Sequence, residues 1–363
     1  MNVSHPFRFF PRLVTVLGAG VFSFFLASSV CAQPSAFEKA KKAYEVYDYK
    51  TAIDMFSRVA DDSSIDLETR RQAMLHLGRI YVGQDMKEEA RSIMEDLVNT
   101  DPPSDFINPD REPPPLLEIY YTVMKEKQGD YAVQKEDPGL QTLTIMDFRN
   151  SSIYEPERYD PLAKGFPSMM INYLNGATDL KVIERQRIQW LLNELKLQKK
   201  VDTVDQSTAV KVGNLLGATA VLFGNYSVVS DDRMRLSGRL VKVETSEILL
   251  AEKVTGEPDE FFSLVRELSQ NLTRAINVEV EDTELETGSE TRLLDAQLAY
   301  ARGLDEMEDE NYQAARTQFK QALEYDSNYT LAKKRLESLQ PMLASAQSDS
   351  TDTSDGEGGL RDR

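Results

Sequence analysis

Apolar residues recur every three or four positions over residues 35–128 and again over 291–339, the spacing of one face of an α-helix. Between these stretches, residues 140–277 combine short apolar runs, typical of strands, with further stretches of helical spacing. The pattern predicts a central domain of strands and helices flanked by two helical segments.

The first helical stretch contains the order Gly78, Tyr81, Ala90 and Pro102. This spacing is that of a tetratricopeptide repeat, a helical hairpin about 34 residues long. Small residues at Gly78 and Ala90 would let two helices approach closely, while Tyr81 would help to fill the seam. We predict tetratricopeptide-like hairpins over residues 35–128.

The second helical stretch repeats the pattern with Gly303, Ala315 and Phe319 at the same relative offsets. A capping helix over Leu331–Leu339 would cover its exposed face. Because one hairpin buries too little surface to be stable alone, we expect residues 291–339 to pack on the central domain or on the first helical segment.

The central stretch predicts an α+β domain with a mixed sheet and helices packed against it. Asp160-Pro161 is a helix start, with Asp as the cap and Pro in the first turn. The predicted elements are, in order, a strand at 142–148, a helix at 162–174, a strand at 180–183, helices at 187–197 and 207–216, strands at 220–229, 233–243 and 248–254, and a helix from 258 to about 276.

Charge and composition limit the classes of partner that the protein is expected to bind. The chain has 363 residues and a net charge of -18, from 42 basic and 60 acidic residues. Such an acidic chain repels phosphate groups, so nucleic acid is not expected as a partner. Residues 345–363 hold almost no apolar side chains, and we predict a disordered tail there.

The first 32 residues have the features of an export signal. Basic residues lie near the start, an apolar stretch follows, and Val30-Cys31-Ala32 places small or apolar residues where a signal peptidase binds. Cleavage between Ala32 and Gln33 is therefore expected. Two alternatives stay open: a lipoprotein processed before Cys31, and an uncleaved membrane anchor. Val30 fits the lipoprotein alternative poorly.

Few residues are suited to catalysis. After removal of the signal, His76 is the remaining histidine and no cysteine is left. His76 lies between two leucines, where a packing or solvated role is expected, and catalytic triads and histidine metal sites are disfavoured. Acidic clusters such as Glu306, Glu308 and Glu310 are expected to be solvated, and Trp190 to be packed. We predict no enzymatic activity, cofactor or metal.

The order of motifs in the central domain, from Glu184-Arg185 through Leu191-Leu192 to Gly217-Ala218 and Gly224, resembles that of the CsgG family. In that family a Glu-Arg pair ends a strand and leads into a helix, and a Gly-Ala pair precedes the central strand of the sheet. The residues that carry the resemblance are Glu184, Arg185, Leu191, Leu192, Glu194, Gly217, Ala218 and Gly224. The best-known member is the curli secretion channel of the outer membrane, so the resemblance implies a cell-envelope protein.

One departure from the channel concerns membrane insertion. The channel uses two long β-hairpins per subunit, whose outer faces must be apolar. Here Arg233, Arg235 and Arg239 lie on one face of a predicted strand, and no room for a second hairpin follows. Arginine facing lipid at mid-bilayer costs about 2–4 kcal/mol. We therefore expect no transmembrane barrel.

These observations predict a non-enzymatic adaptor of the periplasm, located at or near the inner face of the outer membrane. Its helical repeats and CsgG-like domain would bind envelope or secretion proteins, with self-association into an oligomer as a further expectation. The resemblance implies curli-like transport or regulation of wall synthesis. The alternative is a lipid-anchored subunit of an outer-membrane secretion channel.

Overall fold

The computed structural model describes residues 35–100, 107–131, 141–178, 180–196, 205–278 and 291–352. The predicted signal at 1–32, with Cys31 and the expected cleavage between Ala32 and Gln33, lies outside these residues. All elements below belong to the unit Ala36–Arg363. No helix among the described residues is long and apolar enough to cross a membrane.

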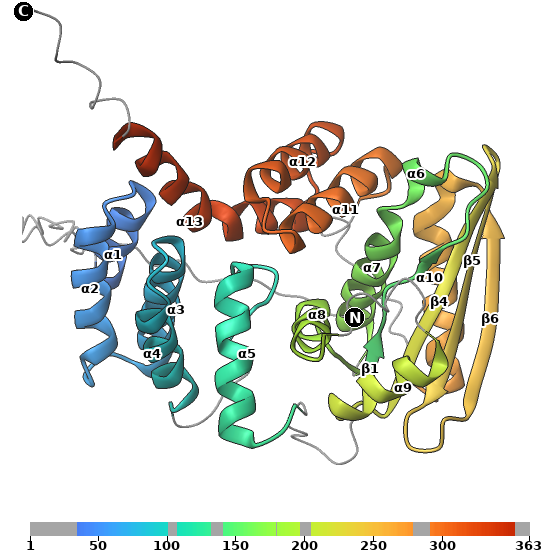
Figure 1. Ribbon diagram of the computed structural model, residues 1–363, viewed down its shortest axis with the longest axis horizontal. Helices are drawn as coiled ribbons and strands as arrows, with labels where there is room; N and C mark the ends of the chain where they lie inside the picture. The colour runs from blue at the N-terminus through green and yellow to red at the C-terminus, as the bar shows by residue number, and fades with distance from the viewer. Residues whose placement is uncertain are drawn as a thin grey trace, which may run out of the picture. The chain divides into compact units, whose positions relative to one another are not determined.

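The N-terminal helical segment consists of helices packed in sequence order (Figure 1). Asp48 caps α2 by accepting a hydrogen bond from the Thr51 amide at 3.2 Å, and Asp66 caps α3 in the same way at 2.9 Å from the Thr69 amide. Its core contains Phe56, which is fully buried. The helices are α1 (Ala36–Glu45), α2 (Tyr49–Asp61), α3 (Leu67–Gly83), α4 (Lys87–Val98) and α5 (Pro114–Gln128).

Residues 141–278, the sheet domain, form the mixed sheet that the sequence predicts, and the α+β fold class is confirmed. The strand order is β3-β1-β4-β5-β6, with β2 also paired to β4. The β1–β3, β1–β4 and β2–β4 pairs are parallel, and the β4–β5 and β5–β6 pairs are antiparallel. The strands are β1 (Thr142–Ile145), β2 (Arg149–Asn150), β3 (Lys181–Val182), β4 (Ala220–Ser230), β5 (Arg233–Lys242) and β6 (Ile248–Gly256).

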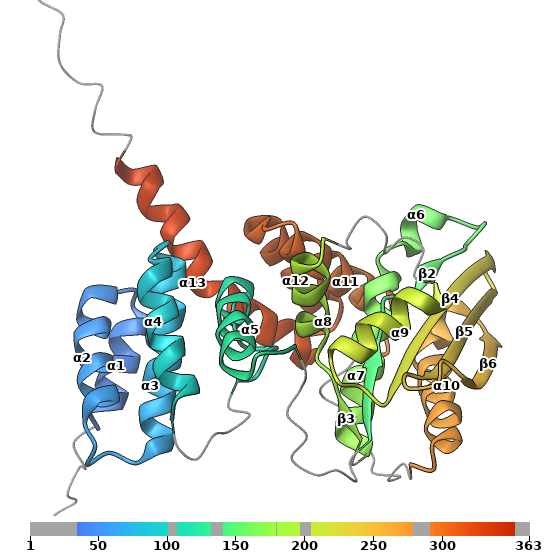
Figure 2. The same ribbon diagram turned by 60° about the horizontal axis from the view of Figure 1, so that its bottom comes forward.

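Helices cover the sheet unequally. One face packs on α7 and α10 around a large core that includes Phe166, Leu222 and Leu268. The other face packs on α8 and α9, where Val221 and Val241 join a second core. Figure 2 shows α9 across part of the sheet. The helices are α6 (Pro156–Tyr159), α7 (Leu162–Ala177), α8 (Arg185–Glu194), α9 (Gln206–Leu215), the 3-10 turn η2 (Pro258–Glu260) and α10 (Phe261–Ala275).

The C-terminal helical segment consists of α11 (Leu294–Glu308), α12 (Tyr312–Tyr325) and α13 (Thr330–Asp352). The expectation that it packs on another part of the chain is confirmed, because α11 packs on α7 and α13 packs on α3 (Figure 1). A Cβ added to Gly83 in α3 would lie only 2.6 Å from the Pro341 carbonyl oxygen, so the two helices touch backbone to backbone. Two helical segments far apart in sequence are therefore joined.

The main boundary differences from the sequence prediction are at the first strand and at the last helix. The strand predicted at 142–148 ends at Ile145 as β1, and a separate short strand, β2, begins at Arg149 and pairs with β4 at Asn225 and Tyr226. Helix α13 continues to Asp352, past residue 345 where the composition placed the start of the tail. Residues 353–363 lie outside the described residues, so a disordered tail there stays a prediction.

Candidate site at the junction of the sheet domain and the helical segments

The Glu-Arg pair lies where β3 passes into α8. Glu184 is the N-cap residue of α8 and Arg185 is its first helical residue. Farther along the same helix, Leu191 and Leu192 are buried in the second core, and Glu194 pairs with Lys125 of α5 at 2.6 Å. The motif therefore holds α8 between the sheet and the N-terminal helical segment.

The two glycines of the motif lie where the backbone leaves no place for a side chain or adopts a conformation that favours glycine. Gly217 adopts φ +69° in the turn between α9 and β4, a region that favours glycine, and buried Ala218 follows it. Gly224 lies in the middle of β4, where an added Cβ would stand 2.1 Å from the Ser237 carbonyl oxygen and 2.5 Å from the Phe148 ring. A side chain at Gly224 would push β4 away from its neighbours.

The repeat residues lie in helix seams. An added Cβ on Gly78 would meet Met94 at 2.9 Å, and one on Gly303 would overlap the Phe319 ring at 2.4 Å. Ala90, Ala315 and Phe319 are fully buried, and Tyr81 is partly buried against the N-terminal core. Close helix pairing at these positions supports the tetratricopeptide-like prediction, which stays a prediction.

Arg185 is the centre of an ionic cluster that sequence reasoning did not find. Its Nε and Nη2 donate hydrogen bonds to the two Asp147 carboxylate oxygens, at 3.1 and 3.0 Å. Gln189 donates to the same carboxylate at 3.1 Å, and Nη1 of Arg185 donates to Glu308 of α11. The Arg185 and Asp147 side chains are only 7% and 12% exposed. Arg185 thus ties the sheet to the C-terminal helical segment.

Lys164 of α7 extends this cluster. Its amine lies 2.6 Å from Glu308 and 2.5 Å from Asp305, both on α11. The Arg185 cluster, as we use the term, consists of Asp147, Lys164, Arg185, Gln189, Asp305 and Glu308. It joins the segment after β1, together with α7 and α8, to α11 through charge-assisted hydrogen bonds.

Burial and mutual contact shift the pKa values of the cluster residues in opposing directions. Burial lowers the pKa of Arg185, but Asp147 and Glu308 outweigh it, so the net pKa is raised above the ordinary value. Burial raises the pKa of Glu308, and the positive charges of Arg185 and Lys164 reverse this, so that its pKa is lowered. For Asp147 burial dominates and raises the pKa, with Arg185 opposing.

A second arginine joins α13 to the loop before α5. Arg335, 4% exposed, donates to the Pro109 carbonyl oxygen at 3.0 Å and to Asp110 at 2.7 Å. With its amide turned, Gln186 of α8 accepts from Arg335 at 2.8 Å. Arg335 therefore links all three parts of the chain, next to the Arg185 cluster.

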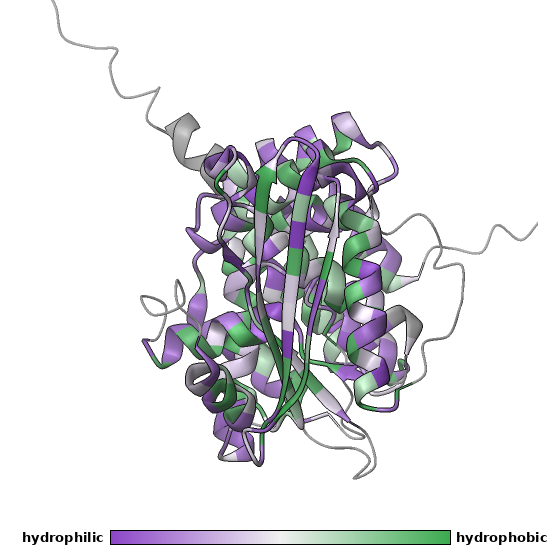
Figure 3. Ribbon diagram, turned by 90° about the vertical axis from the view of Figure 1, so that its right-hand side faces the viewer, coloured by the Kyte–Doolittle hydropathy of each residue, from purple (hydrophilic) through white to green (hydrophobic). Residues whose placement is uncertain are grey.

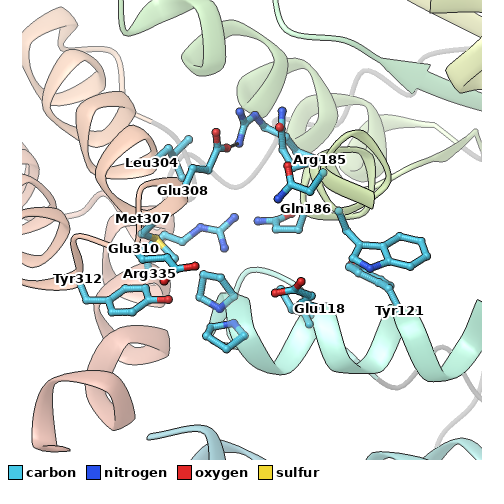
Figure 4. Close-up of a pocket in the computed structure, with 16 residues that line it drawn as sticks. Glu118, Tyr121, Arg185, Gln186, Leu304, Met307, Glu308, Glu310, Tyr312 and Arg335 are labelled. Atoms are coloured by element: carbon cyan, nitrogen blue, oxygen red, sulfur yellow. Dashed lines mark hydrogen bonds and ion pairs between the residues drawn. The ribbon is translucent and has the colours of Figure 1, made fainter. Parts of the chain in front are cut away.

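A small cavity lies between these contacts. It has a volume of about 140 Å³ and is lined by residues from α5, α8, the α11–α12 region and α13. Figure 4 shows Arg185 and Gln186 on one side, Glu118 and Tyr121 on another, and Glu308, Tyr312 and Arg335 facing them. This combination of carboxylate, guanidinium, amide and aromatic groups suits a polar side chain of a partner.

Two other side chains singled out in the sequence are packing residues. Trp190 is 6% exposed, packs against Tyr121 at 5.7 Å between ring centroids and donates to Thr122 at 3.3 Å, as expected. His76 is 8% exposed and stacks on Phe56 with ring centroids 4.7 Å apart. Burial, with Arg79 and Lys41 adding to it, lowers the pKa of His76 to about 3.

The expectation of solvated acids is wrong at Glu308, since its carboxylate pairs with Arg185 and Lys164. A charge in an apolar run was the available signal for the cluster: Asp147 directly follows buried Ile145 and Met146, and Lys164 interrupts an apolar helix. The described residues contain no group of three or more His, Cys, Asp or Glu side chains placed to hold a metal ion.

The comparison with protein families agrees with this architecture. The model of the family described as curli production assembly/transport component CsgG matches residues 133–230. The match spans β1 to β4 and includes the Glu-Arg pair, Gly217, Ala218 and Gly224. The CsgG resemblance of this stretch is confirmed.

Solved structures give more distant similarities. The LpoB C-terminal domains from Salmonella enterica and Escherichia coli are each 18% identical, with TM-scores of 0.26 and 0.25; the matches cover 33% and 34% of this chain and 87% and 86% of those chains. Lipoprotein GNA1162 from Neisseria meningitidis is 13% identical, with a TM-score of 0.25, and the match covers 38% of this chain and 97% of that one. No curated protein matched the chain.

Proposed function

We propose that the protein is a non-enzymatic adaptor of the cell envelope, in which a CsgG-like sheet domain and two helical segments act together to bind protein partners. The observation that carries the proposal is the Arg185 cluster. Arg185, the buried charge of the CsgG motif, pairs with Asp147 and Glu308 and so holds α11 against the sheet, which presents the helices and the sheet as one binding body.

The helical segments offer a groove for such binding. It lies between the α1–α2 turn and helices α12 and α13, has a volume of about 280 Å³, and is lined by Tyr47, Leu336 and Leu343 together with Arg316 and Lys320. Tyr47 is 55% exposed, so its ring is accessible to a partner that enters the groove. Aromatic side chains at such positions commonly anchor protein partners.

The CsgG match supports placement in the envelope, and the expected signal at 1–32 supports export to the periplasm. Curli-like transport and regulation of wall synthesis are the processes that this proposal includes. A soluble periplasmic location is tested by fractionation and by mass spectrometry of the mature N-terminus. A start at Gln33 in the periplasmic fraction supports the proposal. A lipid on Cys31 in detergent-dependent rings would support the secretion-channel alternative.

The binding role is tested by in-cell cross-linking of the tagged full chain. The decisive variant is Tyr47→Glu, with Tyr325→Glu as its matched control, because Tyr325 is 47% exposed and does not line the groove. The wild type and Tyr325→Glu should cross-link to the same envelope proteins, and Tyr47→Glu should lose at least one of them. Equal patterns from all three chains would contradict binding through the groove.

A further inference from the structure

The outer face of strands β4, β5 and β6 is only partly covered. Helix α9 packs on Val221, Phe223 and Val241 at one end of this face. Farther along β4 and β5 the same face is exposed, as at Asn225 and Arg235. Figure 3 views the molecule from the side of these strands, where hydrophilic and hydrophobic positions alternate.

Strand pairing arranges the exposed residues of this face in rows. One row runs from Arg149 of β2 through Asn225 and Ser237 to Lys253 of β6. The two adjacent rows contain Arg235, beside Ser227 and Thr255, and Arg239, beside Phe223 and Ala251. We define the open basic face by its four cations, Arg149, Arg235, Arg239 and Lys253, all of them exposed.

These three rows contain no acidic residue, although the chain as a whole has a net charge of -18. Among the described residues the four cations make no ion pair with one another or with a neighbour. Elsewhere in the protein, exposed basic residues commonly lie beside acids, as Arg158 does with Glu155 at 3.1 Å. The open basic face is therefore a local concentration of unneutralised positive charge.

The dimensions of the face suit an extended chain. Arg235 and Arg239 are four residues apart on one strand, which corresponds to about 14 Å. Arg149 and Lys253 are separated by three strand spacings, again about 14 Å. An extended acidic segment can place carboxylates against several of these cations at once, and arginine binds carboxylate through two parallel hydrogen bonds.

We propose that the open basic face binds an acidic, extended segment of a partner protein. This inference rests on the proposed adaptor function and names the class of its partner. Charge favours a peptide over an anionic membrane, because the net charge of -18 repels an extended anionic bilayer, whereas a short segment meets only the basic face.

The test measures fluorescence anisotropy of a labelled twelve-residue peptide of alternating Glu and Ser, with alternating Gln and Ser as the uncharged comparison. The face variant is R149Q/R235Q/R239Q in the mature chain. The control variant, K39Q/K50Q/K87Q, removes the same charge from exposed positions on three helices away from the sheet and outside the groove. Circular dichroism checks that both variants are folded.

The wild type and control variant should bind the acidic peptide with affinities within twofold of each other, and the face variant at least tenfold more weakly. Equal loss in both variants would overturn the inference, as would binding of phosphatidylglycerol vesicles through the face without peptide binding. Partner cross-linking that persists in the face variant would refute the inference alone and leave the adaptor function intact.

Discussion

Removing the Arg185 guanidinium should strongly destabilise the protein. The variant Arg185→Met keeps an unbranched apolar stem but leaves the Asp147 carboxylate, 12% exposed, with Gln189 as its remaining hydrogen-bond donor. Breaking a buried ion pair by removing one partner costs about 3–5 kcal/mol, because the other charge stays buried and uncompensated. Glu308 adds less to this cost, since it is 28% exposed and retains Lys164 at 2.6 Å.

The matched control is Arg158→Met. Arg158 also reaches α11 from the sheet domain, by pairing with Asp295 at 3.5 Å, but its side chain is 45% exposed. An exposed pair of this kind contributes below about 1 kcal/mol. The two variants therefore differ in the burial of the lost charge, while both remove an arginine that joins the same two parts of the chain.

Urea unfolding followed by far-UV circular dichroism measures both variants at pH 7. Arg185→Met should lose about 3–5 kcal/mol of unfolding free energy, and hydrogen exchange should increase in α11. Adding Asp147→Leu to Arg185→Met removes the uncompensated carboxylate and should restore part of the stability. If Arg185→Met and Arg158→Met differ by less than about 1 kcal/mol, the cluster does not hold the parts together as described.

Three further predictions follow from local geometry. The pKa of His76 is lowered to about 3 in the folded protein, against about 6.5 in the unfolded chain. Neutral His76 therefore stabilises the fold above pH 6.5, and this contribution is lost as the pH falls toward the folded-state pKa. Between pH 7 and pH 5 the loss should be about 2 kcal/mol in urea unfolding, and His76→Phe should abolish that part of the pH dependence. Gly224→Ala should lower the unfolding free energy by more than about 2 kcal/mol, because its Cβ meets a backbone carbonyl oxygen. The control Gly238→Ala should cost less, because its Cβ stays 3.2 Å from a flexible Leu222 side chain. Equal melting temperatures of the two variants would contradict this prediction. Arg335→Met should make α13 more susceptible to limited proteolysis, and an unchanged cleavage rate would show that Asp110 and the Pro109 carbonyl do not anchor that helix.

Periodicity predicted the elements of the sheet domain and of both helical segments because each pattern reports which side of an element is buried. Spacing alone could not reveal the partners across elements. Arg185 was recognised as part of a motif, but Asp147 lies 38 residues before it and Glu308 lies 123 residues after it. Glu308 in particular has the sequence context of a solvated acid, and only the packing of α11 on α7 brings its carboxylate to two cations. The end of β1 at Ile145 and the separate strand β2 have the same origin, since both depend on pairing with β4.

The contact between α13 and α3 has a consequence for biogenesis. Pro341, Met342 and Ala344 lie against a bundle whose own residues are made more than 210 positions earlier. During synthesis the early helices are complete before the final helix is made, so one flank of their bundle stays uncovered until α13 packs on it. Shortening the chain before residue 341 should leave that flank exposed in the finished protein.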